Sequence, residues 1–283
     1  MTAVRIVEYT DPSCPFGYNS EPLRQRMKWL YGDALEWELR MVGLSDDVAE
    51  MEAKGFTPEL LAGFEADFAR EHGMPAAGKP RPRLSTSMDA CRAIVAARLH
   101  GEPGQDRLLA RWLRIRYFGD LQPMDDPETI AGAARDAGID PEALAGWVAR
   151  EDVEQALWDD LAAARNPAPA AHALDHKLGG PPEERRYTCP SFEISRDGTL
   201  LSIPGFWPFA PYEVALANLA PEVARRADPE SAEEVLRWAD EPLATVEVAV
   251  LRGISRDEAR AELEAVGTER KAGSDDGYWT LKA

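Results

Sequence analysis

Cysteine is scarce in this chain, whose 283 residues include only Cys14, Cys91 and Cys189. An odd and sparse set of cysteines does not make a disulfide framework. In a reducing compartment such residues are either small buried side chains or reactive thiols. The sequence therefore excludes a disulfide-stapled secreted domain, and each cysteine has to be explained by its own surroundings.

Positive charge is also in short supply. The chain has 32 lysines and arginines against 50 aspartates and glutamates, which gives a formal net charge of −18. Binding to nucleic acid or to an anionic membrane surface depends on clustered basic side chains. No run of residues approaches the roughly 18 apolar positions that a membrane helix needs. We therefore expect no nucleic-acid partner and no membrane partner.

A secretory signal is the third absence. After Met1 the chain goes directly to the strand-like run Val4-Arg5-Ile6-Val7-Glu8-Tyr9. A signal peptide would instead place a charged segment before an apolar one. We therefore expect the protein in the cytoplasm.

The beginning of the chain predicts a β-α-β unit. The β-branched run at 4–10 is typical of a short strand, which Asp11-Pro12-Ser13 ends. A helix is expected from near Cys14 to about Gly32, with Pro15 in its first turn, where a missing N–H costs nothing. The alternation of period two over 35–43 predicts a second strand.

From Thr57 to about Leu178 the pattern is almost wholly helical. Thr57, Asp126 and Asp140 are each followed by a proline and a glutamate, which is typical of a capped helix start. Breaks are expected at 166–169 and at 179–182, where proline and glycine gather.

Strands return near residue 191. The run 191–194, the turn at 196–198 and the run 199–203 predict a hairpin, and a helix is expected over about 210–219. In the last sixty residues, helices are expected from Asp228, over 243–251 and after the capping box that begins at Ser255. With two short strands around Gly277, this tail resembles a winged helix, and its acidity favours packing or dimerisation over DNA binding.

The strongest local motif is Asp11-Pro12-Ser13-Cys14-Pro15-Phe16-Gly17. It places Cys14 at the first turn of a helix, directly after a strand. Backbone N–H groups and the helix dipole stabilise a thiolate at such a position and lower its pKa. Cys14 is therefore the candidate nucleophile; the alternative is a structural cysteine that only fills space.

A second motif, Tyr187-Thr188-Cys189-Pro190-Ser191-Phe192, precedes the predicted hairpin and helix. Together with the β-α-β unit, Cys14 at the helix start and a long helical insertion, it resembles the DsbA family of the thioredoxin superfamily. The insertion is also similar to that of kappa-class glutathione transferases and 2-hydroxychromene-2-carboxylate isomerases. The resemblance covers roughly residues 4–220.

The resemblance implies an α/β fold. A thioredoxin-like domain (1–56 and 183–222) would carry a large all-helical insertion (57–182) and a small winged-helix-like C-terminal module (223–283). It also implies that Pro190 is a cis-proline facing Cys14, and that the backbone of Cys189 lies against the nucleophilic sulfur. The substrate is then expected to contact the residues around these two motifs and one tryptophan beyond the hairpin: Pro15, Phe16, Gly17, Pro190 and Trp207.

One departure from that family matters for the chemistry. The family's redox motif is Cys-x-x-Cys, and here the fourth position is Gly17. Cys14 therefore has no resolving partner on its own helix, and the usual dithiol cycle cannot run through positions 14 and 17. Two readings of Cys189 stay open: a second thiol that bonds to Cys14 or shares a metal with it, or a small apolar filler.

Other candidates have plainer explanations. Cys91 lies on an amphipathic helix, where core packing is expected. His172 and His176 would share a helix face, which suits a metal pair or a solvated surface. Arg185 and Arg186 would hold an anion if they border the thiol. Three aromatic residues gather between prolines as a substrate wall or as core: Phe206, Trp207 and Phe209.

The favoured function is thiol–disulfide oxidation–reduction or thiol transfer, with Cys14 as nucleophile and a small thiol or disulfide as substrate. No cofactor is expected beyond a low-molecular-weight thiol, and no bound metal. A thiol-cofactor-dependent isomerase or transferase of the kappa-like kind is one alternative. A non-catalytic protein that holds a soft metal or an apolar ligand is another. The sequence leaves a homodimer open.

Overall fold

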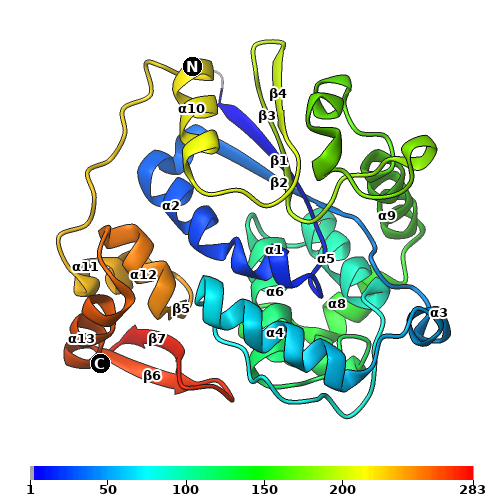
Figure 1. The fold of residues 1–283 in the computed structure, drawn as a ribbon, viewed down its shortest axis with the longest axis horizontal. Helices are drawn as coiled ribbons and strands as arrows, with labels where there is room; N and C mark the ends of the chain where they lie inside the picture. The colour runs from blue at the N-terminus through cyan, green and yellow to red at the C-terminus, as the bar shows by residue number, and fades with distance from the viewer. Residues whose placement is uncertain (1–2, 283) are drawn as a thin grey trace.

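A computed structural model describes residues 3–282. Its centre is a four-stranded sheet in the order β2-β1-β3-β4 (Figure 1). Strand β1 runs parallel to β2 and antiparallel to β3, and β4 forms a hairpin with β3. The strands are β1 (Val4–Thr10), β2 (Leu35–Met41), β3 (Ser191–Arg196) and β4 (Thr199–Ile203).

The sheet follows the predicted pattern closely. Six of the seven residues of β1 are buried, as expected of a central strand covered on both faces. The hairpin turns at Asp197 and Gly198, whose φ angles of 48° and 82° are both left-handed. A two-residue turn with two positive φ angles matches the twist of the strands that it joins.

The helix expected over 14–32 is interrupted, so that prediction was wrong in part. The structure has α1 (Pro15–Asn19) and α2 (Glu21–Tyr31), separated by Ser20. Pro22 has no N–H to donate to the preceding turn, which breaks the helical ladder there. The Ser20 hydroxyl donates instead to the carbonyl of Gly17, at 2.8 Å.

The predicted helical insertion is present. Thr57, Asp126 and Asp140 each accept a backbone N–H at a helix start, as expected. Residues 73–87 are not helical, contrary to the sequence prediction, because three prolines interrupt this stretch. The α-helices are α3 (Val48–Ala53), α4 (Pro58–His72), α5 (Met88–His100), α6 (Gln105–Arg114), α7 (Pro127–Asp136), α8 (Pro141–Val148) and α9 (Glu151–Ala164).

Shorter turns complete the insertion. A π-helical turn, η2 (Ile115–Gly119), extends α6. Two 3-10 segments, η3 (Pro169–Lys177) and η4 (Pro182–Glu184), lead the chain back to the sheet.

After α10 (Ala210–Leu219) the chain forms the expected winged-helix-like module, with a three-stranded sheet in the order β5-β7-β6. The helix expected at Asp228 begins later, because the Ser231 hydroxyl caps it by accepting the N–H of Glu234. Strand β5 was not predicted. The elements are α11 (Ala232–Trp238), β5 (Leu243–Ala244), α12 (Thr245–Arg252), α13 (Arg256–Val266), β6 (Gly267–Lys271) and β7 (Gly277–Leu281).

The C-terminal module packs against the helix that follows the Cys14 motif. Trp29 and Leu30 of α2 share a buried apolar cluster with Val248 and Ala249 of α12. The Arg26 guanidinium donates to the carbonyl of Leu251, at 2.7 Å. The module therefore helps to fix α2 in place. Among residues 3–282, no helix has the length and apolar character needed to cross a bilayer.

Candidate active site

The loop between β1 and α1 places Cys14 at the start of α1. Cys14 is the N-cap residue, with extended backbone, and its N–H donates to the carbonyl of Asp11 at 3.1 Å. The Asp11 carboxylate fixes the loop, since Oδ1 accepts the N–H and the hydroxyl of Ser13. Its other oxygen accepts the N–H of Leu44 at 2.8 Å. The loop that leads into Cys14 is therefore held by hydrogen bonds within it and to Leu44.

Cys14 and Cys189 meet, as the resemblance implied. The Cys189–Pro190 peptide bond is cis. The Cys14 thiol lies 3.5 Å from the carbonyl oxygen of Cys189 and donates to it. Both cysteines are buried and neither is in a disulfide. The Cys14 thiol therefore lies against the backbone of Cys189, although the two residues are 175 positions apart in the chain.

The pKa values of the two cysteines are shifted in opposite directions. The pKa of Cys14 is lowered below its usual value, first because the Cys189 thiol donates a hydrogen bond to the thiolate. The N–H groups of Gly17 and Phe16 add to this effect, whereas burial and the charge of Asp11 oppose it. The pKa of Cys189 is raised, first by burial and then by its contact with Cys14. Hydrogen bonding from Cys189 therefore favours the thiolate form of Cys14, whereas burial favours the thiol form of Cys189.

The short length of α1 corrects the reason given for this acidity. With five residues before the break at Ser20, α1 carries only a small dipole. Local donors, namely the Cys189 thiol and two N–H groups, stabilise the thiolate instead. The motif placed Cys14 at a helix start, as predicted, but the lowered pKa comes from hydrogen bonding more than from a long helix.

Gly17 occupies the position of the missing second thiol. A Cβ built on Gly17 would lie 3.5 Å from the Cβ of Cys14 and 3.0 Å from the Thr10 hydroxyl. The first distance is within the range found in disulfides. Position 17 therefore keeps the geometry of a two-cysteine motif although it carries no sulfur.

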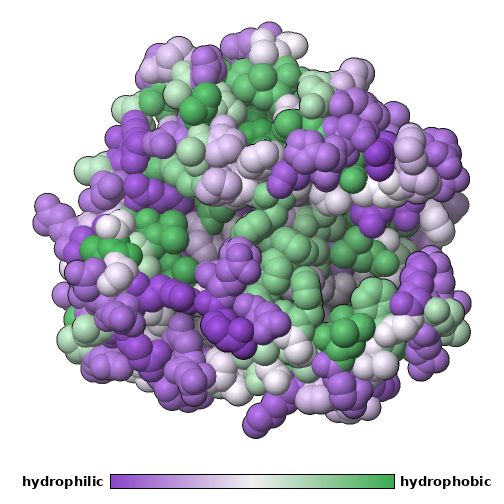
Figure 2. Space-filling model, in the orientation of Figure 1, coloured by the Kyte–Doolittle hydropathy of each residue, from purple (hydrophilic) through white to green (hydrophobic). Residues whose placement is uncertain are grey.

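A cleft of about 590 Å³ opens above the two cysteines. Phe16, Phe68, His72 and Phe206 form an aromatic wall, with Phe16 packed edge-on against Phe68 at 4.3 Å between ring centres. His72 lies between Phe68 and Phe206, at 4.6 and 5.1 Å. Figure 2 shows apolar (green) side chains gathered over α1 and α4 in the hollowed centre of this face.

The opposite wall of the cleft is basic. Lys177 and Arg186 line it together with His176, while Glu71 is the acidic residue of the lining. Among residues 3–282, neither Lys177 nor Arg186 has an ion-pair partner within 4.0 Å. This concentration of basic groups, in a chain with a net charge of −18, favours a ligand that carries negative charge.

Of the predicted substrate contacts, Phe16 lines this cleft, whereas Trp207 does not, nor do Pro15, Gly17 and Pro190; their contact with a substrate stays a prediction. Phe206, the neighbour of Trp207, lines the cleft instead. The indole of Trp207 packs on the core behind the sheet and donates to the carbonyl of Pro204. The Lys177 ammonium lies over the Trp207 ring, 4.2 Å from the ring centre. Trp207 therefore orients a residue of the cleft without lining the cleft itself.

The other candidates separate in the structure. Arg186 lines the cleft, whereas Arg185 turns away and pairs with Asp175. His176 lines the cleft without His172, because the segment is a kinked 3-10 helix in which residues four apart do not share a face. Cys91 is fully buried in the core of the insertion, as expected.

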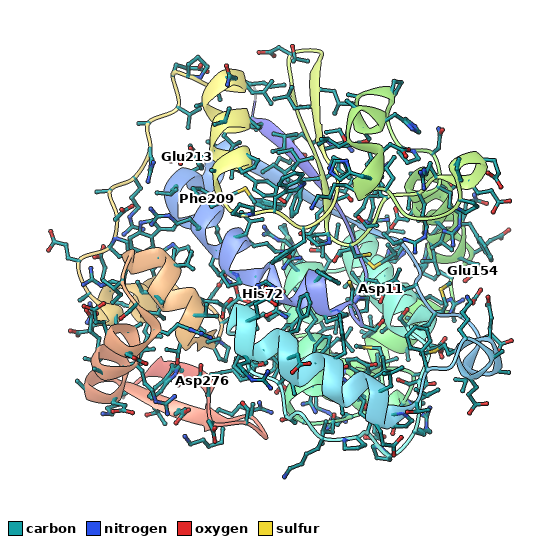
Figure 3. All side chains as sticks on the ribbon, viewed as in Figure 1. Asp11, His72, Glu154, Phe209, Glu213 and Asp276 are labelled. Atoms are coloured by element: carbon teal, nitrogen blue, oxygen red, sulfur yellow. The ribbon has the colours of Figure 1, made fainter. Side chains whose placement is uncertain are left out.

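Several cleft residues were missed from sequence, among them Phe68, His72 and Lys177. A signal for two of them exists, because Phe64, Phe68 and His72 recur at four-residue spacing and therefore share one face of α4. His72 ends α4, and Asp11 follows β1 (Figure 3). No local sequence pattern predicts that this face of α4 covers Cys14, because that contact depends on how the insertion folds back.

Comparison with known proteins supports the fold and gives no close relative. No family model and no curated protein sequence matches the chain. Among solved structures, a protein assigned as a disulfide isomerase from Nitrosomonas europaea has a TM-score of 0.57 at 14% identity, covering 77% of this chain and 96% of that one. The cytosolic disulfide reductase DsbM from Pseudomonas aeruginosa has a TM-score of 0.54 at 13% identity, covering 76% and 97%.

This chain has the DsbA-type thioredoxin fold. A DsbA-type oxidoreductase from Streptomyces coelicolor agrees, with a TM-score of 0.53 at 19% identity, covering 81% of this chain and 94% of its own. DsbM has also been solved with GSH, and that structure gives a TM-score of 0.52 at 12% identity, covering 76% and 98%. The DsbA-type fold thus accounts for nearly all of each neighbour and for about four fifths of this chain.

The described residues contain no group of three or more histidine, cysteine and acidic side chains placed to hold a metal ion. A metal between Cys14 and Cys189 would therefore need its further ligands from outside this part of the chain.

Proposed function

We propose that the protein is a thiol–disulfide exchange enzyme that uses Cys14 as its single nucleophile and an anionic low-molecular-weight thiol as its second substrate. The observation that carries this proposal is the position of Cys14 against Cys189 in a basic and aromatic cleft, where hydrogen bonding lowers the pKa of the Cys14 thiol. The thiolate is the reactive form of cysteine. DsbM, which shares the fold, has been solved with GSH, a thiol of this class.

The exchange takes place in two steps. The Cys14 thiolate attacks one sulfur of a disulfide R–S–S–R′, the Cys14–S–S–R bond forms, and R′S⁻ leaves and takes a proton from solvent. A free thiolate R″S⁻ then attacks the sulfur of R, so that R″–S–S–R forms and Cys14 leaves as a thiolate. The Cys189 thiol donates to Cys14 in both steps, which stabilises it as attacking group and as leaving group.

Cys189 acts in this proposal as a donor more than as a resolving thiol. Burial is the first cause of its raised pKa, and burial persists when Cys14 is in a mixed disulfide. Cys189 then stays protonated, and a thiol attacks slowly compared with a thiolate. A Cys14–Cys189 disulfide is expected only when an oxidant is present and no small thiol competes.

The cations of the cleft would hold the carboxylates of the small thiol. Lys177 and Arg186 are the cleft residues whose charge is not matched by an ion pair within the described chain. Phe16 and Phe68 would contact the apolar part of the disulfide partner. The cleft thus suits a substrate with one anionic end and one apolar end.

A steady-state experiment tests these assignments. We expect glutathione-dependent reduction of a small disulfide to be lost in Cys14→Ser and kept in Cys91→Ser. Arg186→Gln should raise KM for glutathione and leave KM for uncharged β-mercaptoethanol unchanged. The adjacent Arg185→Gln, which alters an arginine outside the cleft, is the matched control. Equal KM changes in the two arginine variants would refute the anionic substrate.

The thiol-cofactor isomerase or transferase is the alternative that the same experiment separates. In that mechanism the site activates a bound thiol and there is no net oxidation–reduction. A serine hydroxyl at position 14 can still donate to a bound thiolate. Disulfide exchange lost in Cys14→Ser, with isomerisation or transfer activity retained, would favour the alternative.

A further inference from the structure

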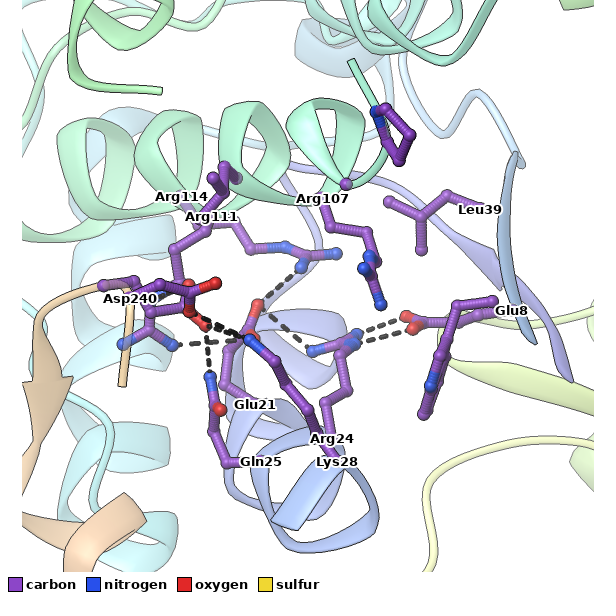
Figure 4. A pocket seen from close by; sticks show the side chains of 15 residues that line it. Glu8, Glu21, Arg24, Gln25, Lys28, Leu39, Arg107, Arg111, Arg114 and Asp240 are labelled. Atoms are coloured by element: carbon purple, nitrogen blue, oxygen red, sulfur yellow. Dashed lines mark hydrogen bonds and ion pairs between the residues drawn. The ribbon is translucent and has the colours of Figure 1, made fainter. Parts of the chain in front are cut away.

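A second cavity lies between α6 and α2, the helix that follows the Cys14 motif. Its volume is about 140 Å³. Since one water molecule takes up roughly 30 Å³, the cavity has room for a group of about four to five heavy atoms. Side chains from β1, α2, α6 and the segment before β5 meet there (Figure 4), so all three parts of the molecule contribute to its wall.

The acidic side chains of this cavity already have partners. Glu8 accepts two hydrogen bonds from Arg24, and Glu21 pairs with Arg24 and Arg114. Asp240 accepts from Lys28 at 2.9 Å. Their acceptor capacity is therefore largely used within the protein.

The unsatisfied groups are mostly donors. Arg107 points into the cavity with no dashed contact in Figure 4, and within residues 3–282 it makes no hydrogen bond or ion pair with another side chain. The Nε atoms of Arg111 and Arg114 are buried and lack a hydrogen-bond partner in the same part of the chain. Gln25 Oε1 is the one buried acceptor of the lining without a partner there. A guanidinium group carries five N–H donors and no acceptor, so the excess is one of donors.

We propose that this cavity binds a small oxyanion, a carboxylate or a phosphate group, against the guanidinium of Arg107. An oxyanion supplies only acceptors, which matches the groups left unsatisfied, and its charge pairs with the one cation of the lining that has no counter-ion at contact distance. Charge-assisted bonds from a guanidinium are the strong class of hydrogen bond. Because the protein has a net charge of −18, its surface as a whole repels anions. The attraction for an oxyanion therefore has to come from the cations that line this cavity.

The cavity is connected to the thiol through one side chain. Arg24 lines the cavity and donates with Nη1 and Nη2 to the carbonyl of Gly17, both at 3.0 Å. Gly17 in turn supplies an N–H that lowers the pKa of Cys14. The bound anion would thus lie one side chain away from the segment that carries the nucleophile, although its binding does not depend on the proposed function.

Isothermal titration of the full-length protein tests the site, with inorganic phosphate and acetate as probes against chloride at matched ionic strength. We expect saturable binding of at least one probe, weakened by about tenfold or more in Arg107→Gln, since a charge-assisted bond is lost. Phosphate-only or acetate-only binding would identify which oxyanion the cavity takes. Arg135→Gln is the matched control, because Arg135 is also on a helix but exposed.

Two results would overturn the proposal. One is no saturable heat with either probe at millimolar concentration, which would leave a water-filled charge network. The other is equal weakening in Arg107→Gln and Arg135→Gln, which would mean diffuse charge attraction. Arg107→Lys guards against misfolding of the glutamine variant: it keeps the charge, and binding between that of the wild type and that of Arg107→Gln is expected.

Discussion

Cys14 and Cys91 lie on two sides of the same carboxylate and behave in opposite ways. Asp11 accepts from the Cys91 thiol at 3.7 Å, and its charge also raises the pKa of Cys14. The pKa of Cys91 is raised well above the usual value, first by burial. The pKa of Cys14 is lowered, first by the donor Cys189. One acidic neighbour thus accompanies a thiol with a raised pKa and a thiol with a lowered pKa.

This comparison shows that exposure alone does not decide reactivity. Cys91 is 0% exposed and Cys14 only 5%, so both lose most of their hydration. Cys14 differs in facing a cleft and in having donors that replace water, whereas the Cys91 thiol is itself a hydrogen-bond donor to Asp11. Burial disfavours a thiolate unless hydrogen bonds to the charged form offset it.

The largest expected effect is a difference in alkylation. Cys14 should react with iodoacetamide at neutral pH faster than Cys91, since hydrogen bonding lowers the pKa of Cys14 and burial raises that of Cys91, and each unit of pKa changes the thiolate fraction about tenfold. Peptide mass spectrometry of the folded protein over time measures both rates. Equal alkylation rates in the folded protein would contradict the difference between the two cysteines. As a control, the two rates should become similar when the protein is unfolded in urea.

A cysteine at position 17 should convert Cys14 into half of a disulfide. The built Cβ of residue 17 lies 3.5 Å from that of Cys14, so Gly17→Cys is expected to oxidise in air. Gly146→Cys is the control, because Gly146 has nothing within 4 Å of its Cβ position. Counting thiols in the unfolded proteins should give two fewer in the first variant, and equal counts would contradict the geometry.

The shared carboxylate gives a smaller effect on both cysteines. Asp11→Asn removes a charge that raises the pKa of Cys14 and of Cys91, so both pKa values should fall. The two oxygens of Asp11 accept the N–H groups of Leu44 and Ser13. An asparagine amide has only one oxygen, so one of these N–H groups would face an NH₂ group. Leaving buried groups unsatisfied costs about 1–3 kcal/mol of unfolding free energy.

Urea unfolding measures that cost, and alkylation against pH measures the two acidities. Asp47→Asn is the control, since Asp47 is an exposed N-cap that accepts the N–H of Ala49, and Asn caps a helix about equally well. A fall in the pKa of only one cysteine would show that Asp11 does not act on both.

Local patterns were enough to place Cys14 at a helix start but not to predict its surroundings. Strand β1, the cap at Cys14 and the hairpin turn at Asp197 depend on neighbouring residues, and the sequence predicted each of them. The contact between Cys14 and Cys189 came only through resemblance to a family, since it joins residues 175 apart. His72 and Lys177 enter the cleft because the insertion folds back over α1, which depends on packing across the whole molecule.

The C-terminal module was the least predictable part in its placement. Its winged-helix-like pattern is visible in the sequence, but its placement also involves α6 of the insertion, through the buried ion pair of Arg111 with Glu247, which are 136 residues apart. Such pairs leave no local signal, because a buried arginine looks in sequence like a surface one. The cavity at Arg107 is a consequence of that docking and was invisible for the same reason.

The most direct test of the account is the pH dependence of Cys14 alkylation in three proteins: wild type, Cys189→Ser and Cys189→Ala. The wild-type profile should rise with a midpoint below the usual thiol pKa, because the Cys189 thiol stabilises the thiolate. Cys189→Ser keeps a donor and should keep the low midpoint, whereas Cys189→Ala removes the donor and should move the midpoint to higher pH. A low midpoint retained in Cys189→Ala would contradict the claim that Cys189 activates Cys14.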